Sequence, residues 1–204
     1  MSESEILHEI FHSLQKNQKE KHDELLEEAQ SKIDSVKYSK TVLVELYPFE
    51  NEIFGLDKGV ELKGDNIVNK EVKKNYFSKN GRLVMTEDVL ATNKVTGRSF
   101  YFYRDDFIER ISFHKIGTFK LKSLSRFYNE SGELINKGIM GEACWSFKYV
   151  NDLLTLIHVE EKEYSSGDIQ KREIELIYDE GKSLKEVINK YESGSSQVMY
   201  RRRR

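Results

Sequence analysis

The chain has 204 residues, of which 38% are hydrophobic and 33% are charged, and its formal net charge is −2. This length can bury a sizeable core, and 11 tyrosines and 11 phenylalanines are more than disordered chains usually carry. The nearly balanced charge argues against a global field that would attract nucleic acid or an anionic membrane. The single cysteine, Cys144, excludes both an intramolecular disulfide and a zinc cluster built from cysteines.

The first residues do not form a basic stretch followed by an apolar stretch, so we expect no secretory signal. No apolar run approaches the roughly 20 residues that a membrane helix needs. These two observations predict a cytoplasmic protein that does not act at a membrane.

Residues 3–36 are expected to be helical, with Ser4 as a candidate N-cap. Two groups of apolar residues recur there at helical spacing, first Leu7, Ile10, Phe11 and Leu14, then Leu25, Leu26, Ala29, Ile33 and Val36. The stretch 15–24 between them is entirely polar. Either one long helix crosses solvent there or two helices meet at a break, and we favour one helix that docks by both ends.

From Thr41 the pattern changes to β-branched and aromatic residues, and Thr41–Tyr47 predicts the first strand, ended by Pro48. Strand and turn signals then alternate every 10 to 16 residues as far as Tyr178. Three corners share one pattern, an aromatic residue, a polar corner with glycine and then leucine: Tyr76–Leu83, Arg126–Leu134 and Ile177–Leu184. Such corners are typical of an antiparallel meander.

Residues 182–192 return to helical spacing and predict a short helix, and 198–204 predict a flexible basic tail. The expected fold is therefore α+β and mainly β. A long N-terminal helix packs on a large antiparallel β-meander of about ten strands over 41–178, with a short C-terminal helix, in a single domain over 1–197.

The corners Tyr128–Leu134 and Tyr178–Leu184 resemble the YD-type or toxin-antitoxin-associated β-hairpin repeats of bacterial proteins. Such repeats form the shell of polymorphic toxins or the small partner that neutralises them. This chain is too short for a shell, so the resemblance implies an immunity or antitoxin-type protein.

The chemical motif that stands out is His8-Glu9-Ile10-Phe11-His12, which matches the zinc-binding pattern H-E-x-x-H. No third ligand motif follows it, and we expect exposed helix histidines without bound metal. His8 and His12 remain the candidate metal ligands of an alternative function, a metal-dependent hydrolase. Cys144 lacks the preceding glycine and following helix of a cysteine-protease nucleophile, so we expect a structural residue.

Sheet faces rich in tyrosine and arginine suit protein interfaces. The residues predicted to bind a partner are Tyr101, Tyr103, Arg126, Tyr128 and Tyr149. A second alternative is a nucleic-acid-binding adaptor, which would use the basic stripe of Lys115, Lys120, Lys122 and Arg126 together with Arg201–Arg204.

No glycine-rich phosphate loop and no G-x-S-x-G elbow occurs, which disfavours nucleotide use and serine hydrolysis. The sequence favours a non-enzymatic protein-binding module without a cofactor, whose partner is a protein such as a toxin.

Overall fold

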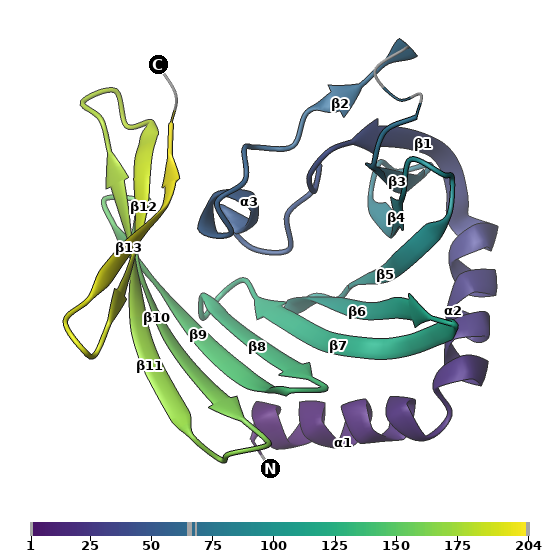
Figure 1. Cartoon of the computed structure of the whole chain (residues 1–204), viewed down its shortest axis with the longest axis horizontal. Helices are drawn as coiled ribbons and strands as arrows, with labels where there is room; N and C mark the ends of the chain where they lie inside the picture. The colour runs from purple at the N-terminus through teal and green to yellow at the C-terminus, as the bar shows by residue number, and fades with distance from the viewer. Residues whose placement is uncertain (1, 65–66, 68, 203–204) are drawn as a thin grey trace.

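The computed structural model describes residues 2–64, 67 and 69–202, and a single antiparallel sheet organises them (Figure 1). The α-helices among the described residues are α1 (Glu3–Lys16), α2 (Gln18–Lys32) and α3 (Glu50–Ile53). The thirteen strands are β1 (Ile33–Ser39), β2 (Glu61–Leu62), β3 (Val72–Ser78), β4 (Leu83–Val89), β5 (Val95–Tyr103), β6 (Phe107–Ile116), β7 (Thr118–Tyr128), β8 (Glu133–Gly138), β9 (Gly141–Val150), β10 (Leu153–Glu163), β11 (Ile169–Tyr178), β12 (Leu184–Tyr191) and β13 (Ser196–Arg201).

From β3 to β13 each strand pairs with the next strand along the chain, as in a meander. Only β1 and β2 depart from this order, because β1 pairs with both β3 and β2 and so places β2 at the edge. The antiparallel meander is therefore confirmed, with thirteen strands in place of about ten. None of the helices among the described residues is long and apolar enough to cross a membrane.

The sheet curves strongly around the segment 40–60, which carries α3, while α1 and α2 lie outside the curve (Figure 1). We call the face toward this segment the inner face and the opposite one the outer face. Helix α1 packs on β7 and β8, and α2 packs on β4, β5 and β7. Three hydrophobic clusters result: a large one on each face, and a small one formed by Phe77, Leu83 and Tyr101. The outer core contains Leu7, Phe11, Ala29, Met85, Phe100, Ile111, Phe113, Leu121, Leu124 and Ile135. The inner core contains Leu46, Tyr47, Ile53, Phe127, Leu134, Trp145, Phe147, Leu154, Ile157, Val159, Ile174, Leu176 and Val187.

The N-terminal helix is present but broken at Asn17, so two helices meet where one long helix was expected. The cap of α1 is Ser2 rather than Ser4, and it forms a capping box with Glu5. At the break, the Leu121 amide of β7 donates to the Gln18 side chain at 3.0 Å. A break lets two short helices follow a curved sheet that one straight helix could touch only locally.

Residues 33–36, predicted as the end of the helix, belong to strand β1. The predicted strand Thr41–Tyr47 is also wrong, because this stretch is irregular and belongs to the inner segment. Leu46 and Tyr47 are buried against the inner face. Its backbone is bonded by side chains instead of a ladder: Val42 donates to Asn51 at 3.2 Å, and Leu46 donates to Glu50 at 2.8 Å.

The predicted C-terminal helix 182–192 is strand β12, and much of the predicted tail 198–204 is strand β13. The apolar residues of 182–192 recur at helical spacing, which wrongly indicated a helix. In the structure the pairing of β12 with β13 shifts register between Val187 and Ile188. Such an irregularity lets neighbouring apolar residues fit a strand. Val187 and Ile188 are both β-branched, which favours a strand. The pairing of β12 with β11 also covers the edge that β11 would otherwise expose.

The corner chemistry holds at Gly81 and Gly132, which adopt φ values of +77° and +59°. In the third corner the left-handed position falls on Lys182, with φ +60°, and not on Gly181. There the Asp179 side chain accepts from the Ser183 amide at 2.9 Å, which fixes the turn by another route.

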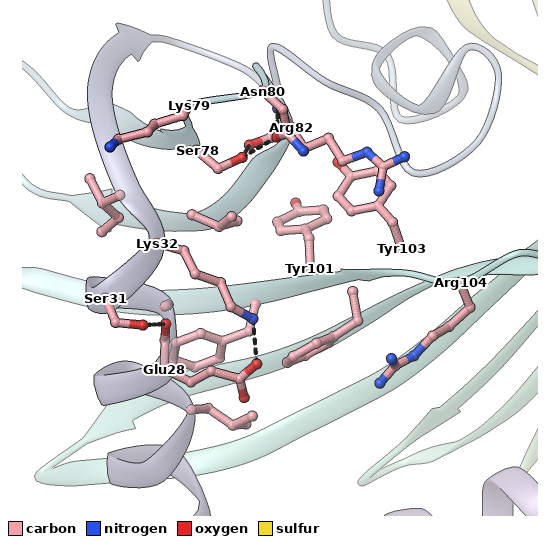
Figure 2. Close-up of a pocket in the computed structure, with 16 residues that line it drawn as sticks. Glu28, Ser31, Lys32, Ser78, Lys79, Asn80, Arg82, Tyr101, Tyr103 and Arg104 are labelled. Carbon is pink, nitrogen blue, oxygen red and sulfur yellow. Dashed lines mark hydrogen bonds and ion pairs between the residues drawn. The ribbon is translucent and has the colours of Figure 1, made fainter.

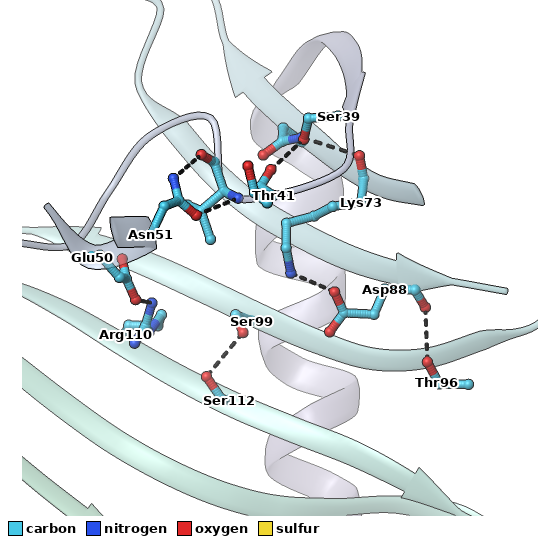
Figure 3. Close-up of polar contacts among 12 residues, drawn as sticks. Ser39, Thr41, Glu50, Asn51, Lys73, Asp88, Thr96, Ser99, Arg110 and Ser112 are labelled. Atoms are coloured by element: carbon cyan, nitrogen blue, oxygen red, sulfur yellow. Dashed lines mark hydrogen bonds and ion pairs between the residues drawn. The ribbon is translucent and has the colours of Figure 1, made fainter. Parts of the chain in front are cut away.

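A buried ion pair joins the inner segment to the sheet (Figure 3). Arg110 on β6 binds the Glu50 carboxylate of α3, and the side chains keep only 18% and 7% of their surface exposed. The other Glu50 oxygen accepts the Leu46 amide, so both carboxylate oxygens have a donor. The pair therefore fixes the position of the segment that fills the curve.

Replacing Arg110 by methionine is expected to lower the free energy of unfolding by about 3–5 kcal/mol, because it leaves the Glu50 charge buried without a partner. Urea denaturation measures the change. The double variant Arg110→Met/Glu50→Gln should recover part of the loss. Lys171→Ala, which breaks an exposed pair with Glu160, is the matched control and should leave stability near that of the wild type. Equal losses in Arg110→Met and Lys171→Ala would contradict the prediction.

His22 of α2 is buried among rings and gives a pH dependence with a definite sign. It stacks on Phe119 with ring centroids 4.3 Å apart, and burial lowers its pKa below the ordinary 6.5. The unfolded chain therefore takes up a proton as pH falls below about 6.5, while the native state does not, so stability falls with acidification. We expect urea denaturation between pH 8 and 5 to show a smaller loss in His22→Phe than in the wild type. Parallel curves would contradict this account.

Candidate functional site

The turns of a meander fall alternately on two edges of the sheet, and these two edges differ in chemistry. One edge has mostly polar corners, such as Ser78–Gly81, Arg104–Asp106, Asn129–Gly132 and Asn151–Asp152, although Tyr149 (48% exposed) and Val150 (57%) lie beside the last of them. The opposite edge exposes large apolar side chains at the turns after β6, β8 and β10: Ile116 (70% exposed), Ile139 (45%), Met140 (68%) and Tyr164 (40%). We call these four residues the apolar turn edge. Ile139, Met140 and Tyr164 lie on adjoining turns, since the Tyr164 amide bonds to the Met140 carbonyl, and exposed apolar residues that gather in this way mark interaction sites more often than scattered single residues do.

The β8–β9 turn at the centre of this edge is held in place by its neighbours. The Ile139 amide donates to the Lys122 carbonyl at 3.2 Å, and the Tyr164 amide donates to the Met140 carbonyl at 3.0 Å. Gly141 follows at a close approach of two chains, where a Cβ would lie 2.2 Å from the Lys162 carbonyl oxygen. The backbone on both sides therefore fixes the turn while Ile139 and Met140 remain exposed.

A groove of about 650 Å³ opens beside this turn, and we call it the edge groove. Ile139 and Met140 form its apolar rim. The polar side chains that line it lie on the inner face of the sheet and include Ser123, Asn136, Glu161 and Gln170. Ser125 donates to the Asn136 amide oxygen at 2.7 Å, and Arg172 donates to Glu161 at 2.7 Å. These bonds orient two of the polar side chains that a ligand in the groove would meet.

Lysines flank the apolar turn edge. Lys122 and Lys162 line the edge groove, and Lys115 and Lys120 lie on the neighbouring β6–β7 hairpin. None of these four lysines forms an ion pair within the described part of the chain, although Lys115 lies over the Phe119 ring. Three carboxylates also line the edge groove: Glu142 and Glu161 pair with Lys137 and Arg172, and Glu163 has no ion pair within the described residues. The unpaired charges around the apolar centre are therefore mainly positive, a combination that complements an apolar patch with acidic neighbours.

The five residues predicted to bind a partner do not gather on one surface. Tyr101 and Arg126 are buried, and they lie on opposite faces of the sheet. Arg126 pairs with Glu109 at 2.6 Å and lies over the Phe107 ring, while the Tyr128 hydroxyl donates to Glu3. Their contacts are internal ones.

Tyr103 is half-buried under the Arg82 guanidinium, with 5.2 Å between that group and the ring centroid. Tyr149 is exposed at the polar edge. The four residues of the expected basic stripe do not form one exposed surface, since Arg126 is buried while Lys115, Lys120 and Lys122 are exposed.

Ile139 and Met140 were not predicted from the sequence, although a local signal was present. The turn reads Gly138-Ile139-Met140-Gly141, with two large apolar residues where corners usually carry polar ones. The groove beside them could not be predicted, because its lining comes from strands far apart in the sequence.

His8 and His12 lie together on the exposed face of α1, with their Nε2 atoms 3.0 Å apart. Zinc sites need three or four protein ligands, and no group of three potential ligands occurs within the described residues. The arrangement offers two ligands at the surface without a cleft around them.

The Cys144 thiol donates to the Glu133 carboxylate at 3.2 Å. Partial burial, together with this carboxylate, raises the pKa of Cys144 to about 12. The thiolate needed for nucleophilic attack is therefore disfavoured at neutral pH.

Comparison with protein-family models, with curated protein sequences and with solved structures finds no match to this chain.

We expect zinc to bind weakly at His8 and His12, and removal of metal to leave the fold unchanged, because two exposed imidazoles make an incomplete site. Metal analysis after purification, with thermal unfolding in the presence and absence of a chelator, measures both effects. Stoichiometric zinc that is lost in His8→Ala would contradict this expectation and support the hydrolase.

Proposed function

We propose that the chain is a non-enzymatic protein-binding module that docks its partner on the apolar turn edge. The observation that carries the proposal is the pair Ile139 and Met140, fixed by neighbouring backbone and exposed beside the edge groove. A turn that is already ordered loses little conformational entropy on binding. Apolar anchors next to a groove are the usual centre of a protein interface.

The partner has an apolar patch with acidic residues around it, because the apolar turn edge is flanked by Lys115, Lys120, Lys122 and Lys162. Opposite charges around an apolar centre raise the association rate and select the partner. In the more specific form of the proposal the partner is a bacterial toxin and this chain is its immunity protein. That form is supported by the resemblance of the hairpin corners to toxin-associated repeats.

The test compares two substitutions at one position, Met140→Ser and Met140→Glu. Serine removes apolar contact area, and glutamate additionally places a negative charge opposite acidic groups of the partner. We expect capture of the partner from the native cell to weaken about tenfold or more with Met140→Ser and further with Met140→Glu. The additional loss should shrink as salt is raised, since salt screens surface charges.

Val60→Ser is the matched control, because Val60 is as exposed as Met140 but lies before β2, away from the edge groove. A partner retained equally by wild type and Met140→Glu would refute docking at this edge. For the immunity form, the captured protein should arrest growth when expressed alone, and co-expression of this chain should relieve the arrest.

A further inference from the structure

The ladder between β4 and β5 stops before the two strands end. Their pairing runs from Val89 with Val95 as far as Met85 with Phe100. The next pairs in this register would join Val84 to Tyr101 and Leu83 to Phe102, and neither forms. Both strands nevertheless continue, β4 pairing with β3 and β5 pairing with β6. The sheet is therefore split locally, and the edges of two neighbouring strands face a gap.

A cleft of about 640 Å³ occupies this split, between the end of α2, the β3–β4 turn and the end of β5 (Figure 2). We call it the β4–β5 cleft. Its aromatic lining is the run from Phe100 to Tyr103, and Val84 faces the run from β4. Leu83 and Tyr101 pack together with Tyr103 and Val44, so side-chain packing takes part of the place of the missing ladder. The volume lies in the range of sites for small molecules and cofactors.

The charged residues that line the β4–β5 cleft are Lys32, Lys79, Arg82, Arg104 and a single acidic residue, Glu28. Glu28 is already paired with Lys32 at 2.5 Å. Lys79, Arg82 and Arg104 form no ion pair within the described ranges of the chain. Three positive charges are therefore left without a carboxylate around one cleft.

Figure 2 shows how these groups are arranged. Arg82, Tyr103 and Arg104 lie on one side, Lys32 and Lys79 on the other, and Tyr101 lies between them. The Arg82 guanidinium lies over the Tyr103 ring, which fixes its plane while leaving the N–H groups at its edge for hydrogen bonds. Charges spread in this way suit an elongated anion with several negative groups better than a single small ion.

We propose that the β4–β5 cleft binds a nucleoside polyphosphate, with its phosphates at Arg82 and Arg104 and its ring against the aromatic strand end. Arginine guanidinium groups bind phosphate oxygens in pairs of hydrogen bonds. The unpaired strand edges at Val84 and Tyr101 face the gap, where backbone groups can bind the edge of a heterocyclic ring. No glycine-rich loop is involved, so this site lies outside the sequence motifs for phosphate.

The proposal is independent of docking at the apolar turn edge, because the two sites share no lining residue. Calorimetric titration of the full chain tests it with three probes, ATP, inorganic tripolyphosphate and adenosine. We expect ATP to bind with one site per chain. Tripolyphosphate should bind at least tenfold more weakly, because it lacks the ring, and adenosine should show no measurable binding.

The double variant Arg82→Gln/Arg104→Gln should weaken ATP binding at least tenfold. The matched control is Lys120→Gln/Lys122→Gln, which removes the same charge at a distant edge and should keep the wild-type affinity. Thermal unfolding of both variants verifies that they remain folded.

Three results would overturn the proposal: no binding of ATP to the wild type, equal weakening in the two double variants, or tripolyphosphate binding as tightly as ATP. The second would indicate attraction by net charge alone. The third would indicate an anion site that does not recognise the ring.

Discussion

A curved single sheet has two faces, and a meander by itself buries neither of them. In this chain α1 and α2 cover the outer face, while the segment 40–60 fills the inner one. The Glu50–Arg110 pair connects that segment to the middle of the sheet, in surroundings where an unpaired charge would be costly. The inner core, which extends to Val187 of β12, therefore depends on a piece of irregular chain that enters before most of the sheet in sequence.

Buried polar groups make this filling specific. The Asn51 side chain accepts from the Val42 amide and donates to the Val42 carbonyl at 2.9 Å, so it replaces a strand partner for that residue. Glu45 accepts from both the backbone and the side chain of Asn51, while its burial raises its pKa. An apolar filler of the same volume would lack these directional contacts and would fix the segment in the curve less uniquely.

Features that are fixed by residues close together in the sequence could be predicted, and features that are fixed by distant residues could not. Corners such as those at Gly81 and Gly132 are fixed by residues next to each other, and the meander was predictable for that reason. The stretch 41–47 has strand composition, yet its Leu46 amide bonds to Glu50, which in turn binds Arg110, more than 60 residues further along the chain. The β12 strand was missed because its apolar spacing fits a helix equally well until the neighbouring strand is considered.

The candidate sites were also predictable only where they depend on neighbouring residues. Tyrosines and arginines on strands were expected at a surface, but cross-strand neighbours and helices bury Tyr101 and Arg126. The signal at Ile139 and Met140 was local and could have been found. The β4–β5 cleft could not, because it arises where a ladder ends, which depends on the divergence of two strands and not on either strand's residues.

Charge pairing across strands is common on the exposed sheet. On the outer face of β9–β12, Glu160 pairs with Lys171 at 2.9 Å and Glu175 with Lys190 at 2.9 Å. Around the β4–β5 cleft, in contrast, Lys79, Arg82 and Arg104 line one cavity and form no ion pair within the described residues. Like charges that gather without compensation cost stability. A bound anion would remove that cost, which is the physical argument for the ligand proposed there.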